Sequence, residues 1–184
     1  MNQESSSCLP EIPEKYTQEY IKLLKKLEFG NERTSIKLKK IYAFMEDFAS
    51  FVATFSVCGK GCSFCCHQHV YLTEFEARYI EQNTGRQCNA EKRVATTQVS
   101  GPCPFLDQAG ACTIYESRPF HCRTYHTLDD PKFCETGEEH YVFGSNNGEY
   151  TVSFYKHFSQ IIHAYNRNNP ALDIRDFFGS RLAD

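Results

Sequence analysis

The sequence has no tryptophan, no long apolar run and no strong excess of charge of either sign. Its 184 residues carry 20 basic and 23 acidic side chains, for a net charge of −3, and this balance does not favour nucleic acid or an anionic membrane as a partner. The longest strongly apolar stretch, Phe48 to Val57, is about half of the ~20 residues that a transmembrane helix needs. We therefore expect no nucleic-acid binding and no membrane binding, while a protein partner remains open.

Secretion and the common catalytic motifs are not indicated either. The N-terminus, Met-Asn-Gln-Glu-Ser-Ser-Ser-Cys8, is polar and acidic, without the basic and apolar regions of a signal peptide. We therefore expect a cytoplasmic protein, whose thiols stay reduced. No Ser/His/Asp arrangement, phosphate-binding glycine loop or His-Glu-x-x-His motif is evident, so the sequence leaves open whether the protein is an enzyme.

Cysteine is the residue present in excess, with ten in the chain. Four of them fall within nine positions, in the run Cys58-Gly-Lys-Gly-Cys62-Ser-Phe-Cys65-Cys66. The two glycines in this run let the backbone turn tightly. Four more cysteines follow downstream, at Cys103, Cys112, Cys122 and Cys134. Clustered cysteines in a reduced compartment are more often metal ligands than disulfides, because thiolates are soft, charged donors for zinc and iron.

These cysteines and their neighbours resemble the YkgJ-type CxxCxxCC family, a zinc- or iron-chelating domain with eight characteristic cysteines. The resemblance covers about residues 58–134. It rests on the loop thiols and on Cys103-Pro-Phe-Leu-Asp, Gly110-Ala-Cys112-Thr-Ile-Tyr-Glu, Arg118-Pro119 and Cys122-Arg123. One departure is that three residues, not two, separate the first two cysteines of the loop. The resemblance implies a metal site, rather than a reaction, with the ligands Cys58, Cys62, Cys65, Cys66, Cys103, Cys112, Cys122 and Cys134.

The identity of the metal stays open between an iron–sulfur cluster and zinc. Eight thiols exceed the four that one structural zinc uses, which slightly favours the cluster. Cys58-x3-Cys62-x2-Cys65 also has the spacing with which radical S-adenosylmethionine enzymes hold a four-iron cluster, and the family resembles a segment of flagellin lysine-N-methylase. We predict a metal-binding protein. The alternatives are a radical enzyme acting in methyl transfer or protein modification, and a redox or metal sensor.

Other polar residues near the cysteines are expected to support the site rather than to bind the metal. The histidines concerned are His67, His69, His121 and His126. Arg118 and Arg123 are expected either to balance the charge of the thiolates or to form structural ion pairs. Cys8 and Cys88 lie outside the family pattern, and we expect them to be ordinary thiols.

The remainder of the chain predicts helices. Apolar residues at helical spacing indicate helices over about 13–29 and 34–57, the first ended by Gly30. Thr73 and Glu76 have the spacing of a capping box, at the start of a helix that Gly85 ends. Ser117-Arg118-Pro119 indicates the start of a further helix that carries Cys122. Two more helices are indicated around 158–165 and 173–178.

These elements show no alternation of strands and helices, so a barrel or a doubly wound sheet is not expected. We predict a mainly α fold with short irregular or strand segments, in which a metal-stapled cysteine region is flanked by helices. Its parts are a tail and two helices in 1–57, the cysteine region in 58–134 and a C-terminal helical segment in 135–184. All three are expected to form one globular domain.

Overall fold

The computed structural model describes residues 9–59, 61–89, 101–136, 138–144 and 150–179. Within these ranges the fold is mainly helical, as predicted. The helices are α1 (Glu14–Phe29), α2 (Thr34–Val52), α3 (Glu74–Thr84), α4 (Phe120–Thr124), α5 (Phe133–Thr136), α6 (Ser153–Tyr165) and α7 (Ile174–Phe178), and two 3-10 turns are η1 (Phe64–His67) and η2 (Tyr115–Ser117). The strands, of two residues each, are β1 (Tyr71–Leu72), β2 (His126–Thr127), β3 (Val142–Phe143) and β4 (Leu172–Asp173).

The termini of α1 and α3 follow the signals in the sequence. α1 begins after Pro13 and ends at Gly30, whose N–H donates to a carbonyl of the last turn at 3.0 Å. The capping box at the start of α3 is formed in both directions, between the Thr73 and Glu76 side chains and the facing backbone N–H groups. Gly85 ends α3 with φ of 71°, in the left-handed region that glycine tolerates best. Local chemistry is therefore sufficient to set these boundaries.

The end of α2 is the exception. The sequence predicted a helix to about residue 57, but α2 ends at Val52. The apolar spacing continues to Phe55, whose ring packs edge-on against Phe143 at 5.2 Å. The backbone N–H of Val57 donates to the Thr127 carbonyl at 3.1 Å. Contacts with β2 and β3 therefore direct the chain away from the helix before it reaches the cysteine loop.

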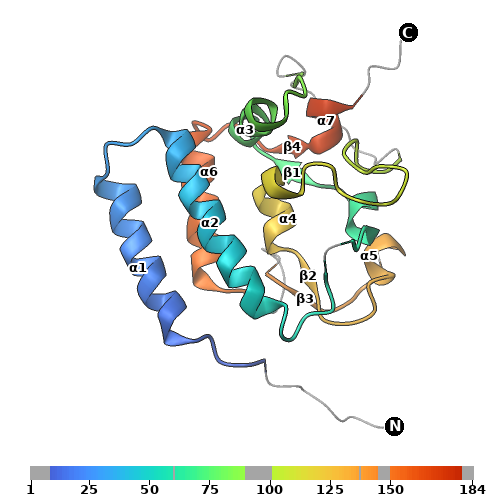
Figure 1. Ribbon diagram of the computed structural model, residues 1–184, viewed down its shortest axis with the longest axis horizontal. Helices are drawn as coiled ribbons and strands as arrows, with labels where there is room; N and C mark the ends of the chain where they lie inside the picture. Colours follow the sequence, from blue (N-terminus) through green and yellow to red (C-terminus); the bar gives the residue numbers. More distant parts are fainter. Residues whose placement is uncertain (1–8, 60, 90–100, 137, 145–149, 180–184) are drawn as a thin grey trace.

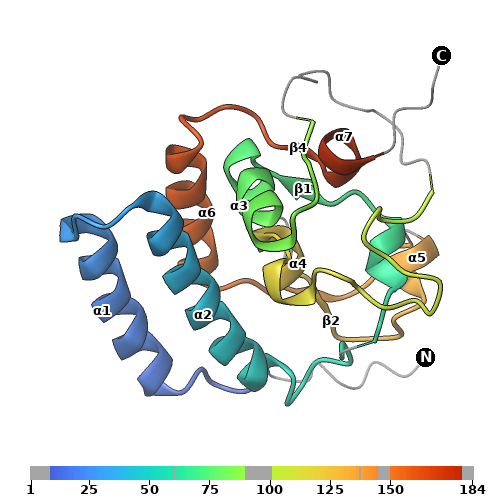
Figure 2. The ribbon, with the colours of Figure 1, turned by 45° about the horizontal axis from the view of Figure 1, so that its top comes forward.

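α1, α2 and α6 lie side by side and enclose an aromatic core (Figures 1 and 2). Phe48 is fully buried near its centre. Its ring packs edge-on against Tyr16 of α1 at 5.1 Å and against Phe154 of α6 at 4.7 Å. Such edge-to-face pairs add to the free energy of burying the rings. No described helix combines the length and the apolar character needed to cross a bilayer.

The cysteine segment lies on the other side of the molecule, where the regular elements are short (Figure 1). β1 pairs with β4 and β2 pairs with β3, both antiparallel. A second apolar cluster is formed by residues of β1, α3 and α7 and by the segment from Cys103 to Ile114. The predicted helices near Cys122 and over 173–178 are confirmed as α4 and α7, whereas α5 and the β2–β3 pair were not predicted.

Candidate metal centre

The cysteine loop is a series of tight turns. The N–H of Cys62 donates to the Gly59 carbonyl at 3.0 Å, and the N–H of Cys66 donates to the Ser63 carbonyl at 2.9 Å. Gly61 has a φ of 97°, so a residue with a side chain would be strained there. The predicted role of glycine in this loop is therefore confirmed at one of its two positions.

Three thiols interact at one end of the loop, and we call them the Cys58 group: Cys58, Cys62 and Cys134. Cys134 comes from α5, which packs on η1, and Gln68 ties the two elements by donating to the Glu135 carbonyl at 3.2 Å. Burial, together with the neighbouring Cys58 and Cys62 thiols, raises the pKa of Cys134 to about 11. A bound cation would relieve this mutual repulsion, because it favours the thiolate form.

Four thiols interact at the other end, and we call them the Cys103 group: Cys66, Cys103, Cys112 and Cys122. The N–H of Cys103 donates to the Cys66 carbonyl at 2.8 Å, and the backbone of Cys112 pairs with that of Leu106 in an isolated antiparallel β-bridge. Burial raises the pKa of Cys103 to about 12, with contributions from the Cys66 and Cys112 thiols. Burial likewise raises the pKa of Cys122 on α4.

Cys65 lies between the two groups. Its thiol forms a hydrogen bond with Cys66 and interacts with Cys122 and Cys58. This bond lowers the pKa of Cys66 to about 7, against the effect of burial and with help from the Arg175 charge. The Cys65 thiol thus interacts with members of both groups.

The β2–β3 pair supplies polar groups around the Cys58 group. The N–H of Thr127 donates to the Cys58 Sγ at 3.1 Å. The Thr127 hydroxyl donates to Asp129 at 2.7 Å, and Asp129 is also 3.1 Å from the Nδ1 of His140. The other ring nitrogen of His140 is 3.0 Å from the Tyr125 hydroxyl. No pattern in the sequence indicates this network, which depends on the pairing of β2 with β3.

Asp173 and Arg175 support the other side of the loop. Arg175 donates to the Cys66 carbonyl at 3.0 Å and to the Gln68 carbonyl at 3.2 Å. Asp173 is buried and accepts from the Val70 N–H at 3.0 Å, and it is 3.1 Å from the Nδ1 of His69. Burial alone would raise the pKa of Asp173, but the hydrogen bonds and charge of Arg175 hold it below its ordinary value.

This depressed pKa predicts a pH-dependent effect of Asp173→Asn. A carboxylate with a folded pKa below its unfolded value contributes stability above an unfolded pKa of about 3.9, and this contribution is lost as the pH falls through the folded pKa. We therefore expect Asp173→Asn to lower the free energy of unfolding at about pH 7 and to have little effect at about pH 2. Urea unfolding at both pH values measures this, with the exposed Asp47→Asn as control. An equal loss at both pH values would contradict the prediction.

Both arginines near the thiols form structural ion pairs, and Arg118 also acts on the thiols. Glu46 accepts from Arg123 at 3.0 Å and from Arg118 at 3.3 Å, so each arginine forms a structural ion pair. The Arg118 charge also lowers the pKa of Cys58 and Cys122, against the larger effect of burial. Its guanidinium lies 3.9 Å from the centre of the Tyr115 ring. Arg118 is therefore placed to balance thiolate charge.

A cavity of about 240 Å³, which we call the thiol cavity, lies among these groups. Four thiols line it: Cys58, Cys62, Cys65 and Cys122. The Nε of Arg118 and the Oγ of Ser56, two other lining residues, are buried and have no hydrogen-bond partner among the described residues. Buried polar atoms are rarely left without a partner. The cavity thus offers unused hydrogen-bonding groups next to four soft donors.

The thiols are not arranged around one common metal position. Over the ranges that the structure describes, no three His, Cys, Asp or Glu side chains are close enough together to hold one metal ion. A single tetrahedral zinc, with Zn–S bonds of about 2.3 Å, needs its sulfurs in mutual contact. The donor types fit a thiophilic metal such as zinc or iron.

The other candidate residues lie around this set. His126 is buried, with its Nε2 3.1 Å from the Arg123 carbonyl, and burial lowers its pKa to about 4. His121 and His69 line a smaller cavity with Cys65. Cys88 belongs to neither thiol group, and its backbone N–H donates to the Glu81 carboxylate at 2.9 Å. Cys8 lies outside the described residues.

A family model named CxxCxxCC, with the description "Putative zinc- or iron-chelating domain", matches residues 57–146. The resemblance seen in the sequence is therefore confirmed, and the match continues beyond residue 134. The chain contains a CxxCxxCC domain in its middle, of the zinc- or iron-chelating type, with α1 and α2 before it and α6, β4 and α7 after it. No curated protein and no solved structure matches the chain.

Proposed function

We propose that this chain is a metal-binding protein that holds an iron–sulfur cluster in the thiol cavity. The cavity, with its four lining thiols and its unpartnered Arg118 Nε, is the observation that carries the proposal. Four thiolates is the number that a four-iron cluster uses. The other four predicted ligands interact with thiols of this lining: Cys134 with Cys58 and Cys62, and Cys66, Cys103 and Cys112 with Cys122.

The unused donors support a cluster over a lone zinc. The sulfide and thiolate sulfurs of a cluster accept hydrogen bonds, and these bonds raise its reduction potential. Arg118 and Ser56 line the cavity, and the Arg118 Nε and the Ser56 Oγ have no hydrogen-bond partner among the described residues. A cluster would supply those acceptors, and the Arg118 charge would offset part of its negative charge. When bound, such a cluster supplies one-electron redox chemistry, which suits electron transfer or sensing.

Radical S-adenosylmethionine chemistry is the second candidate, because three of the lining thiols have the spacing Cys58-x3-Cys62-x2-Cys65. That chemistry needs one iron without a protein ligand. Cys122 lies on the same cavity wall as a fourth thiol, and the described strands have two residues each, with no barrel among them. These observations favour the redox or sensor role over methyl transfer.

The test of the cluster is the iron, zinc and acid-labile sulfide content of protein purified without oxygen, together with its visible spectrum. We expect a coloured protein with iron and sulfide in equal amounts. Colourless protein with stoichiometric zinc and no sulfide would contradict the cluster and leave a zinc domain in its place.

Arg118→Gln tests the hydrogen bond to the cluster. Removing a positive charge and a donor next to the cluster disfavours the added electron, so the reduction potential is expected to fall. Arg78→Gln is the matched control, because Arg78 is exposed on α3 and pairs with Glu74 and Glu81. Equal potentials for Arg118→Gln and the unchanged protein would contradict a contact between Arg118 and the cluster.

A further inference from the structure

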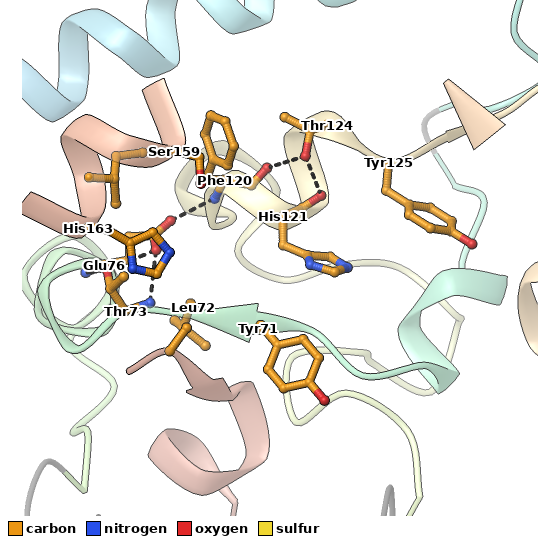
Figure 3. A pocket seen from close by; sticks show the side chains of 12 residues that line it. Tyr71, Leu72, Thr73, Glu76, Phe120, His121, Thr124, Tyr125, Ser159 and His163 are labelled. Atoms are coloured by element: carbon orange, nitrogen blue, oxygen red, sulfur yellow. Dashed lines mark hydrogen bonds between the residues drawn. The ribbon is translucent and has the colours of Figure 1, made fainter. Parts of the chain in front are cut away.

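A second cavity, of about 290 Å³, lies where β1, α4 and α6 meet, and we call it the β1–α4–α6 cavity (Figure 3). Tyr71 lines it from β1, His121 from α4, and Ser159 and His163 from α6. Its volume is close to the lower end of the range for small-molecule sites. The cavity is therefore large enough for a compact ring compound.

This cavity adjoins the cysteines. His121 and Tyr125 line both it and a smaller cavity of about 150 Å³. The smaller cavity also has Cys65 and Cys122 in its wall. α4 and Tyr125 thus contribute side chains to the β1–α4–α6 cavity and to the thiol cavity. A molecule bound against His121 would lie one residue along the chain from Cys122.

The lining offers an ionic ligand no lysine, no arginine and no unused carboxylate oxygen. It contains no lysine or arginine, and its one carboxylate is Glu76. Glu76 Oε1 accepts from the Tyr42 hydroxyl and the Phe120 N–H, both at 2.8 Å. Its Oε2 accepts from the N–H and the hydroxyl of Thr73, both at 2.9 Å. An ion that entered would lose water without gaining a direct ion pair with a lysine, an arginine or an unused carboxylate oxygen, which is costly.

The lining does offer planar rings, and it contains polar groups that form no hydrogen bond with another described side chain. The His121 ring lies nearly parallel to Tyr125, with centroids 6.1 Å apart, and is 6.3 Å from the Tyr71 ring. Figure 3 shows His121 between these two tyrosines along the wall. The Tyr71 hydroxyl, the Ser159 hydroxyl and the His121 ring have no hydrogen bond to another described side chain. Aromatic faces with hydrogen-bonding edges suit a planar polar molecule.

We infer that the β1–α4–α6 cavity binds a small uncharged molecule that carries an aromatic ring and a hydrogen-bonding group of the amide type. The inference goes beyond metal binding and does not rest on it. It follows from the aromatic rings in the wall, the polar groups without a hydrogen bond and the absence of a lysine, an arginine or an unused carboxylate oxygen in the lining.

Three probes of one shape and different charge test this ligand class: benzamide, benzoate and benzamidinium. Isothermal titration of the purified protein is expected to show binding of benzamide, with benzoate and benzamidinium at least about ten-fold weaker, because neither ion finds an unused carboxylate oxygen, lysine or arginine to pair with. Equal binding of all three probes, or no binding of benzamide, would overturn the inference. This part uses the unchanged protein and so does not depend on how any variant folds.

Two substitutions on one helix locate the binding. Ser159→Leu places a larger side chain in the cavity and removes a hydroxyl, so benzamide binding is expected to weaken at least about ten-fold. Gln160→Leu adds the same side chain at the next position, which is exposed and does not line the cavity, and binding is expected to be unchanged. Equal binding by both variants, with unchanged melting temperatures, would overturn the assignment. Metal and sulfide content, measured on the same samples, tests the proposed cluster separately.

Discussion

Removal of the metal is expected to unfold the cysteine segment while α1, α2 and α6 stay packed. Metal binding by clustered thiolates contributes on the order of 10 kcal/mol to folding. Apart from α3, the segment between α2 and α6 has only short elements, such as α4, α5 and two-residue strands, so the metal is expected to contribute much of its stability. The three long helices share an aromatic core around Phe48. Hydrogen exchange on the protein before and after chelation is expected to show faster exchange mainly in 58–136.

Cys122→Ser gives the same test without a chelator. Cys122 interacts with the Cys103 group and lines the thiol cavity, so its loss is expected to lower metal content and to expose the segment. Cys88→Ser is the matched control, because Cys88 belongs to neither thiol group. Unchanged exchange and melting after complete metal removal, or equal metal content in both variants, would contradict a structural role for the metal.

Helix boundaries could be predicted where local chemistry sets them. Pro13 and Gly30 bracket α1, and the Thr73–Glu76 capping box and Gly85 bracket α3. Each of these signals acts within one turn of the residue that carries it. A single sequence contains that information in full, and for this reason the mainly helical fold was read correctly.

The structural elements that were predicted wrongly or missed are those that depend on contacts between residues far apart in the sequence. α2 ends early because Phe55 and Val57 contact Phe143 and Thr127, about 70 residues or more further along the chain. α5 and the β2–β3 pair are too short for a periodic pattern. Apolar spacing carries no information about which distant segment will pair with it, so these elements could not be found from the sequence.

The candidate site, like the fold, could be predicted only in part. The eight cysteines could be named from their spacing and from the family resemblance, but their grouping could not. Cys134 joins Cys58 because α5 packs on η1, and Cys66 joins Cys103 through a backbone hydrogen bond of 2.8 Å. Which thiols share a centre is thus a property of the tertiary contacts, and the assignment of metal ligands stays a prediction.

Glu76→Ala is expected to destabilise the protein by about 3–5 kcal/mol. Glu76 is 3% exposed, and its carboxylate accepts four hydrogen bonds, from Tyr42 on α2, from the Phe120 N–H at the start of α4 and two from Thr73. Loss of the carboxylate leaves these donors buried without an acceptor, and each such donor costs about 1–3 kcal/mol. The midpoint of urea unfolding measures the effect.

Glu74→Ala is the control for this substitution, because Glu74 lies in the same first turn of α3 with an exposed side chain. It is expected to change stability by less than about 0.5 kcal/mol. If Glu76→Ala cost no more than the control, the network would not hold α3 to its neighbours.

The same variant tests how the helical core is joined to the cysteines. Glu76 fixes the first N–H of α4, and Cys122 lies two residues further along that helix. Release of Phe120 is therefore expected to displace Cys122 and to lower metal content, even under conditions where Glu76→Ala is still folded. A folded Glu76→Ala with full metal content would mean that Cys122 is held by the thiol groups alone. Reduced metal in the folded variant would mean that a buried carboxylate outside the cysteine motif positions one of its ligands.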